Sequence, residues 1–442
     1  AGDAYSRALT EKLSHPIEGL LVIRGARIFD SIRGRLTGES TVFVLGGMIT
    51  AVYDGLIDAP PEATVIDGTG KTLMPALWDM HGHVSNNQYL NYLASGITNV
   101  RDMANDPAFI IKTKADIAAG RIVGPDVHAL GFIDKKSPYA APTGMLAETL
   151  EEVLGFVDYY AQHGFLGIKL YSSIEPQWVP DIVDYAHARG LKVLGHIPSG
   201  MTAAQAVRAG FDEITHVNMI LLNFMGAEKI DTRTPLRFTV PGKEGGKLDL
   251  SSKEVREFID LLKEYGVAHD PTMSIFMDMF LNKPGEITTV FSGIADHFPA
   301  SIRRGAISSP GFNAGEEVAF AATAEVTRNL IKLLHENGIL LLPGTDNFLP
   351  GFTLLRELAF YVEAGIPPID ALRLATIEPA KYMGLEQSLG SVSPGKKAQL
   401  VLIGGDPTRN IADLYKAELV IKGRVMFRPA EILREQGFKP FE

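Results

Sequence analysis

The sequence predicts an α/β fold in which a (β/α)8 barrel, or TIM barrel, carries a small β-sandwich domain built from both ends of the chain. Between residues 73 and 387, short apolar stretches alternate with helical stretches such as LEEVLGFVDYYAQHG and VPDIVDYAHARG. Strands that alternate with helices form parallel sheets, and eight such units favour a closed barrel over an open sheet. Outside this region, short alternating runs separated by Gly and Asp are typical of β-hairpins.

The predicted sandwich begins after a polar lead-in, residues 1–17, which we expect to be helical. The hairpin-like runs that follow are LLVIRGARIFD, STVFVLGGMITAVYDG and ATVIDGTG. Similar runs return near the C-terminus as AQLVLIGGDP and AELVIKGRVMF. We therefore assign residues 1–72 and 388–442 to a composite β-sandwich domain and residues 73–387 to the barrel.

Eight apolar stretches are the candidate barrel strands. In chain order they are LMPALWDMH, ITNVRD, DVHALGF, LGIKLY, LKVLGHI, EITHV, VAHD and GILLLPGTD. Arg101 and Asp102, which end the second stretch, are expected to form a structural pair. Two connections are long: residues 218–265, and the mostly helical residues 272–335. Connections of this length usually serve as lids or specificity elements.

Composition narrows the range of functions. The chain of 442 residues contains no cysteine, which excludes disulfides, thiolate metal sites and cysteine nucleophiles. The net charge of −10 argues against a nucleic-acid partner, and no apolar run reaches the roughly 18 residues of a membrane helix. We expect a small-molecule substrate. The first residue is Ala1 rather than Met, as after removal of a leader, and the sequence leaves a cytoplasmic and an exported bacterial (periplasmic) location open.

Polar residues that can bind a metal stand at the carboxyl ends of the predicted strands, the face where barrel enzymes place their active sites. Two of them, His81 and His83, are two residues apart on a strand and should point to the same side. Each residue alone is equally well explained by packing, capping or a snorkelling side chain. Closure of the barrel would bring all of them together, so the joint pattern predicts a shared metal site. The six residues are His81, His83, Lys169, His196, His216 and Asp346.

In this order, the six residues resemble the ligand set of the binuclear amidohydrolase superfamily. The neighbouring motifs IDGTGKTLMPALWDMHGH, GTD, ATIEPAKYMGL and LGSVSPGKKAQLVLIGGDP are also similar to that superfamily. The resemblance covers nearly the whole chain, and it is greatest to the branch of Xaa-Pro dipeptidase-like and imidazolonepropionase-related proteins. Two positions depart from the pattern: Glu378 stands where Asn is frequent, and Gln399 where Asp is frequent. Neither belongs to the ligand set.

The resemblance implies a site with two divalent metal ions, with zinc as the default and manganese, cobalt or iron as alternatives. It implies that Lys169 is carboxylated on its amine and bridges the ions, a role that suits a lysine whose pKa is lowered by burial. His81 and His83 would bind one ion together with Asp346, and His196 and His216 the other. A hydroxide between the ions would attack the substrate carbonyl, with Asp346 as general acid and base.

The leading function is hydrolysis of an amide bond in a dipeptide or an N-acyl amino acid. A cyclic amide or a lactone would suit the same centre. A mononuclear deaminase is a third hypothesis, although such enzymes typically lack the lysine and carry Glu where this chain has Ser199. The fourth is a scaffold that has lost its metals, against which the complete ligand set argues. Many members of the superfamily assemble into dimers or rings, so a homo-oligomer fits the resemblance.

Substrate-binding residues are less clearly indicated by the sequence. Tyr139 follows the third strand, Tyr171 shares its side of the strand with Lys169, and His269 ends the seventh strand. Each is a candidate contact for substrate, and each has core packing or a structural role as the alternative. Lys135 and Lys136 could attract a substrate carboxylate, although loop lysines are more often only solvated.

Overall fold

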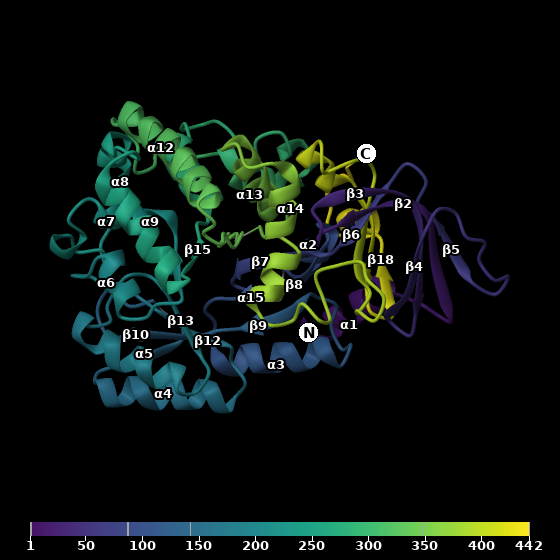
Figure 1. The fold of residues 1–442 in the computed structure, drawn as a ribbon, viewed down its shortest axis with the longest axis horizontal. Coiled ribbons are helices and arrows are strands. Elements are labelled where there is room, and N and C mark those ends of the chain that lie inside the picture. The colour runs from purple at the N-terminus through teal and green to yellow at the C-terminus, as the bar shows by residue number, and fades with distance from the viewer. Residues whose placement is uncertain (1, 86–87, 142, 348, 442) are drawn as a thin grey trace.

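The computed structural model describes residues 2–85, 88–141, 143–347 and 349–441. Figure 1 shows a β-rich part that combines the N-terminal and C-terminal segments, and next to it a larger part in which helices surround short strands. Residues 1 and 442, the outer ends of the two predicted sandwich segments, lie outside the described residues. The predicted helical lead-in is α1 (Gly2–Leu13), but it is followed by the short strand β1 (His15–Pro16).

The strands of the β-rich part come from both ends of the chain, as expected from the sequence. They form one hydrogen-bonded sheet of nine strands in the order β1-β18-β17-β16-β6-β2-β3-β4, with β5 paired to β2. The two ends of the chain join where β6 pairs antiparallel with β16. The strands after β1 are β2 (Leu20–Asp30), β3 (Arg35–Leu45), β4 (Met48–Asp54), β5 (Thr64–Asp67), β6 (Thr72–Pro75), β16 (Gln399–Ile403), β17 (Ala417–Lys422) and β18 (Val425–Phe427).

This single sheet differs from the two separate sheets expected of a sandwich, because it folds back on itself. Register shifts in β2, β3 and β16 mark irregular points at which a sheet can bend. The turn between β3 and β4 then meets the turn between β17 and β18: a Cβ on Gly47 would lie only 3.0 Å from the carbonyl carbon of Gly423. Apolar side chains of β2, β3, β4, β6, β16 and β17 share one buried cluster inside the fold.

The larger part contains parallel strands in the predicted order. A three-stranded sheet joins β7 (Leu77–Gly82), β8 (Ile97–Asp102) and β9 (Asp126–Ala129). A second sheet has the order β11-β10-β12-β13-β14-β15, and its pairs are all parallel. Its strands are β10 (Gly131–Lys135), β11 (Met145–Ala147), β12 (Gly167–Leu170), β13 (Lys192–Gly195), β14 (Glu213–Thr215) and β15 (Ala268–Asp270).

Three predicted strands differ from the observed ones. The first, LMPALWDMH, is divided at Ala76, so that residues 73–75, which the prediction assigned to the barrel, belong to β6 of the nine-stranded sheet, and β7 begins at Leu77. The third, DVHALGF, is divided at Leu130, so that β9 pairs with β8 while β10 pairs with β12. The eighth, GILLLPGTD, has only an isolated bridge between Leu341 and His269. Its backbone nevertheless reaches both neighbours: Leu342 N donates to His269 O (2.8 Å), and Met80 N donates to Pro343 O (2.9 Å). Pro343 has no N–H to donate, which limits a regular ladder at this point.

Helices cover the parallel strands (Figure 1). The predicted helices at 150–164 and 179–190 are α4 and α5, and Thr149 caps α4 through a hydrogen bond from Glu152 N. In the part of the chain that the structure describes, no helix has the length and apolar character that a membrane crossing needs. The helices are α2 (Tyr89–Ala94), α3 (Pro107–Ala118), α4 (Leu150–Gln162), α5 (Val179–His187), α6 (Ala203–Arg208), α7 (Val217–Asn223), α8 (Leu236–Glu244), α9 (Lys253–Tyr265), α10 (Met273–Leu281), α11 (Ala300–Gly305), α12 (Glu317–Glu336), α13 (Phe352–Glu363), α14 (Pro368–Leu374), α15 (Ile377–Tyr382) and α16 (Pro429–Glu435).

Candidate metal centre

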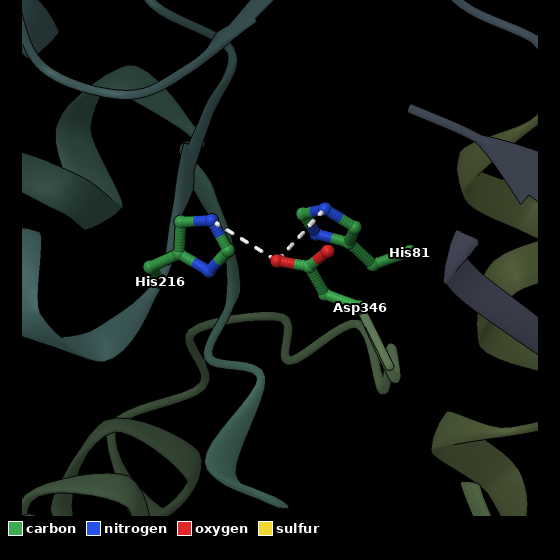
Figure 2. A group of neighbouring side chains, drawn as sticks. All are labelled: His81, His216 and Asp346. Atoms are coloured by element: carbon green, nitrogen blue, oxygen red, sulfur yellow. Dashed lines mark ion pairs between the residues drawn. The ribbon is translucent and has the colours of Figure 1, made fainter. Parts of the chain in front are cut away.

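The structure brings the six predicted metal-binding residues to one place at the carboxyl ends of the parallel strands. Figure 2 shows Asp346 between His81, from β7, and His216, which follows β14. Asp346 Oδ2 lies 3.7 Å from His81 Nε2 and 3.6 Å from His216 Nε2. Asp346 Oδ1 lies 3.0 Å from His83 Nε2. Three possible ligand atoms, one each from His81, His216 and Asp346, lie within 4.8 Å of one another.

The remaining two residues complete this cluster. Lys169, at the third position of β12, places its Nζ 3.0 Å from His81 Nε2. His196 follows β13 directly, and its ring centroid lies 4.8 Å from that of His216. Adjacent parallel strands therefore deliver their last residues to a shared centre, which is the geometry that the strand-end pattern predicts.

Each of the four imidazoles is held by a hydrogen bond at Nδ1. For His81, His83 and His216, this contact turns Nε2 toward Asp346. A metal-binding histidine is usually oriented in this way, by a protein group at its other ring nitrogen. The partners are Asp270 Oδ2 for His81 (2.5 Å), the Ala104 carbonyl for His83 (2.9 Å), Ser172 Oγ for His196 (3.3 Å) and Thr272 Oγ1 for His216 (2.7 Å).

The donor set fits a cation. The Ala104 carbonyl can only accept, so His83 donates from Nδ1, and a neutral ring then has a bare lone pair at Nε2. That lone pair faces a carboxylate oxygen 3.0 Å away. Two acceptors at this distance repel each other unless a proton or a metal ion lies between them. Imidazole and carboxylate ligands without thiolates suit zinc and similar divalent ions.

The protonation states of the side chains in the centre suit metal binding. Burial lowers the pKa of His81 and His196 well below the ordinary value, and it lowers the pKa of His216 to about 3. Burial also lowers the pKa of Lys169, against the opposing charges of Asp346 and Asp270. For Asp346, burial opposes ionisation, but the hydrogen bond with His83 and the nearby positive charges bring its pKa to about 2. The centre thus combines neutral imidazoles with an ionised carboxylate.

His83 is the exception among these histidines. Burial opposes its protonation, but the hydrogen bond and the charge of Asp346 outweigh burial and raise its pKa. The carboxylate therefore draws a positive charge toward this point of the cluster, and a metal ion would take the place of that proton.

Backbone strain is concentrated in the same cluster. Among the described residues, only three that are not glycine have positive φ: His216 (70°), Thr272 (46°) and Asp346 (44°). Each such conformation costs about 1–3 kcal/mol, and it is most unusual for a β-branched residue such as Thr. Strong hydrogen bonds hold two of them in place, from His216 N to Asp270 O (2.6 Å) and from Asp346 N to His81 O (2.7 Å). Strain that the surrounding structure enforces at one place indicates a functional site.

A cavity of about 530 Å³ opens over the centre. Five of the six predicted ligands line it, while His81 lies behind them and is fully buried. Both long connections contribute to its walls, since residues 218–265 supply α8 and residues 272–335 supply α10. The other residues that line it are Val84, Ser85, Ala104, Asn105, Phe132, Ala141, Thr143, Tyr171, Asn218, Arg237, Phe238, Ile275, Phe276 and Met279.

Of the three candidate substrate contacts, only Tyr171 lines the cavity, and its ring centroid lies 4.0 Å from that of His196. Tyr139 is 49% exposed, and its ring packs under the guanidinium of Arg233. His269 is buried elsewhere and donates from Nδ1 to the Ile214 carbonyl (2.8 Å). The structure therefore does not bring Tyr139 or His269 to the cavity.

The candidate lysines and the expected Arg101–Asp102 pair have other partners. Lys135 and Lys136 form ion pairs with Glu175 and Glu148, respectively. The pairing of Arg101 with Asp102 was wrong: Arg101 binds Glu213 through both terminal nitrogens (2.6 and 2.7 Å), and it is buried at the base of the centre. Asp102 instead accepts from the backbone N of Val84 (2.7 Å). The Arg101–Glu213 pair is structural, because a buried Arg is stable only with a hydrogen-bonded counter-charge.

Sequence reasoning missed several residues of the site, among them Asp270 and Arg237. Asp270 orients His81, and Arg237 lines the cavity. Successive residues of a strand point to opposite faces, so in the sequence VAHD either His269 or Asp270 could face the centre. The structure places Asp270 there. Arg237 lies on α8, in a long connection where no strand-end rule applies.

A carboxylate faced by several imidazoles at the ends of parallel strands is typical of metal-dependent hydrolases. Consistent with this class, a model of the amidohydrolase family matches residues 72–426. The chain therefore belongs to the amidohydrolase family. This membership confirms the family and the hydrolase class predicted from the sequence.

Individual relatives match this chain at low sequence identity or over only part of its length. The enamidase of Eubacterium barkeri is 28% identical over 224 residues, which are 44% of this chain and 55% of the enamidase. An adenine deaminase of Methanosphaera stadtmanae is 35% identical over 81 residues, 18% of this chain and 14% of the deaminase. A crystal structure of an Xaa-Pro dipeptidase with methionine in its active site has a TM-score of 0.67 at 21% identity, over 93% of this chain and 100% of the dipeptidase. This likeness shows a shared fold.

Proposed function

We propose that the chain is a binuclear metal-dependent hydrolase that cleaves an amide bond, and that its parallel strands act as one closed (β/α)8 barrel. The observation that carries the proposal is the convergence of three imidazole Nε2 atoms on one ionised carboxylate under a cavity, with the buried Lys169 Nζ beside one of these nitrogens, His81 Nε2. The proposed ligands of two divalent ions, zinc by default, are His81, His83 and Asp346 for one ion, His196 and His216 for the other, and carboxylated Lys169 between them.

Bound divalent ions would supply Lewis-acid chemistry, activating water and polarising a substrate carbonyl. The role of the chain is proton transfer and positioning. Asp346 is ionised, and its side chain is 24% exposed toward the cavity. As the C–O bond forms, its carboxylate takes a proton from the attacking water, and it delivers that proton to the leaving amine as the C–N bond breaks. Asp270 and Thr272 hold His81 and His216 in the required orientation.

We propose a dipeptide or an N-acyl amino acid as substrate. The apolar cavity walls suit an amino-acid side chain, and a structural neighbour is a dipeptidase with methionine in its active site. A cyclic amide is the second candidate, and the similarity to an enamidase supports hydrolysis of an amide-type bond in general. Deamination fits less well: Ser199, which stands where deaminases carry Glu, binds Asp231 (3.2 Å) and does not line the cavity, and Lys169 is part of the centre.

Metal analysis combined with a substrate screen tests this function. We expect about two divalent ions per chain after zinc loading, and hydrolysis within a library of dipeptides and N-acyl amino acids. One ion per chain would support the mononuclear hypothesis, and none would support a scaffold without catalysis. Activity on lactones or cyclic amides, with none on the library, would refute the substrate class but not the metal centre.

The contact between Asp270 and His81 gives a second prediction. We expect Asp270→Asn to lower metal affinity about 10- to 100-fold, because the amide keeps the shape but replaces the carboxyl group that orients His81 and supports it as a ligand. The measurement is retained zinc after dialysis against graded concentrations of a chelator. Asp249→Asn, at an exposed turn of the long 218–265 connection, is the matched control. Equal zinc retention by both variants would show that Asp270 does not support the centre.

A further inference from the structure

One cation in the cavity wall lacks a counter-charge. Arg237, at the second position of α8, lines the cavity together with Lys169 and Asp346. Two arginines near the site do have carboxylate partners: Arg101 pairs with Glu213, and Arg233 pairs with Asp231. Within the described part of the chain, no Asp or Glu pairs with Arg237, and its buried Nε has no hydrogen-bond acceptor.

The position of Arg237 is fixed by its surroundings. Asn218, on α7, donates from Nδ2 to the carbonyl oxygen of Arg237 (2.9 Å) and so ties the start of α8 to α7. The guanidinium carbon lies 4.6 Å from the ring centroid of Phe238 and 5.8 Å from that of Tyr171. An arginine held between aromatic rings loses little further freedom when it binds an anion, so the site is organised before the substrate arrives.

We propose that Arg237 is a specificity-determining residue that binds a free carboxylate of the substrate. The proposal rests on the hydrolase function proposed above and deepens it. A guanidinium pairs with a carboxylate through two parallel hydrogen bonds, the strongest pairing available to an arginine that has no carboxylate partner within the protein. Beside it, Ile275, Phe276 and Met279 form an apolar wall that suits an apolar side chain. The substrate class is then an N-acylated apolar amino acid or a dipeptide with a free carboxylate, whereas neutral lactones and cyclic amides are disfavoured.

A matched pair of compounds tests this assignment. N-acetyl-L-phenylalanine carries the carboxylate, and N-acetyl-L-phenylalanine amide replaces it by a neutral group of the same shape. With zinc-loaded full-length enzyme and acetate release as the readout, we expect kcat/KM to be about 100-fold higher for the acid. Arg237→Gln should remove most of this ratio by lowering kcat/KM for the acid alone. Arg237→Lys should keep part of the ratio, because lysine retains the positive charge but cannot form two parallel hydrogen bonds with the carboxylate.

Arg233→Gln is the control for a general change in electrostatic field. It removes one positive charge from the same connection, but Arg233 is exposed and already paired with Asp231. We expect it to leave the acid-to-amide ratio unchanged. Wild-type enzyme with equal kcat/KM for the two compounds, or Arg237→Gln with equal losses on both, would overturn the proposal.

A binding measurement separates this proposal from the proposed hydrolysis. Calorimetric titration of both compounds into zinc-loaded Asp346→Asn, with and without Arg237→Gln, does not depend on turnover. If acetate is never released but the acid binds selectively and loses about 100-fold in affinity with Arg237→Gln, the carboxylate site stands and the N-acyl substrate fails. Absence of acid binding, or equal affinity for both compounds, overturns the carboxylate site whatever the turnover.

Discussion

Asp346→Asn is expected to lower kcat by about 10²- to 10⁴-fold on whichever substrate the chain hydrolyses, the contribution typical of a positioned general acid and base. Asp346 has its pKa lowered to about 2, so it is ionised and ready to accept a proton at neutral pH. An amide in the same position still offers one oxygen as a metal ligand but cannot carry the proton to the leaving amine. The loss should therefore appear mainly in kcat, with a smaller change in KM.

The variant should fold normally, which makes its kinetics interpretable. Asp346 has a φ of 44°, and Asn is among the few side chains that tolerate this region of backbone conformation. The thermal unfolding midpoint and the zinc content, measured beside the kinetics, should show a folded protein that still binds metal. A folded, zinc-loaded Asp346→Asn with more than about one tenth of wild-type kcat would place the general acid and base on another residue.

The six metal-binding candidates could be located from the sequence because one rule applies to all of them. In alternating strand–helix units, parallel strands end on the same face. Residues such as Lys169 and His216 therefore converge, although 46 residues lie between them in the sequence. The rule needs only the end of each strand, which an apolar run followed by a polar residue marks well.

Other features depend on information that the local pattern does not contain. The three-residue strand β15 is too short to fix which of His269 and Asp270 faces the centre. The partner of Arg101 lies 112 positions away, at Glu213, while Asp102 is adjacent in sequence and was the simpler choice. Arg237 lies on a helix inside a long connection, and only the tertiary structure places that helix over the cavity.

The nine-stranded sheet shows the same limit on a larger scale. Hairpin patterns predicted strands at both ends of the chain, and these strands are present. Whether they form two sheets or one depends on the pairing of β6 with β16 and on the irregular points where the sheet turns over. These depend on contacts between segments more than 300 residues apart, as in the pair of Met74 with Val401. The alternation of apolar residues is the same in both arrangements.

Lys169→Met is expected to remove at least one metal ion per chain and to lower kcat by roughly 10³-fold or more, because Lewis-acid stabilisation amounts to several kcal/mol. Lys169 is 2% exposed, and its Nζ lies 3.0 Å from His81 Nε2. Burial lowers its pKa, so the amine is more easily neutral and able to take up carbon dioxide. Methionine has nearly the same length and is apolar, so the packing around this position should persist.

The comparison that isolates the carbamate uses a second lysine. Lys192→Met removes the same charge from the neighbouring strand β13, where the side chain is 41% exposed and lies 3.9 Å from Asp212. We expect this control to keep both ions and full activity. Wild-type protein prepared in ¹³C-labelled bicarbonate should show a carbamate carbon in its NMR spectrum, and Lys169→Met should not. If Lys169→Met instead retains two ions with normal kcat, the lysine does not bridge them, and the ions must be held by the imidazoles and Asp346 without a modified amine.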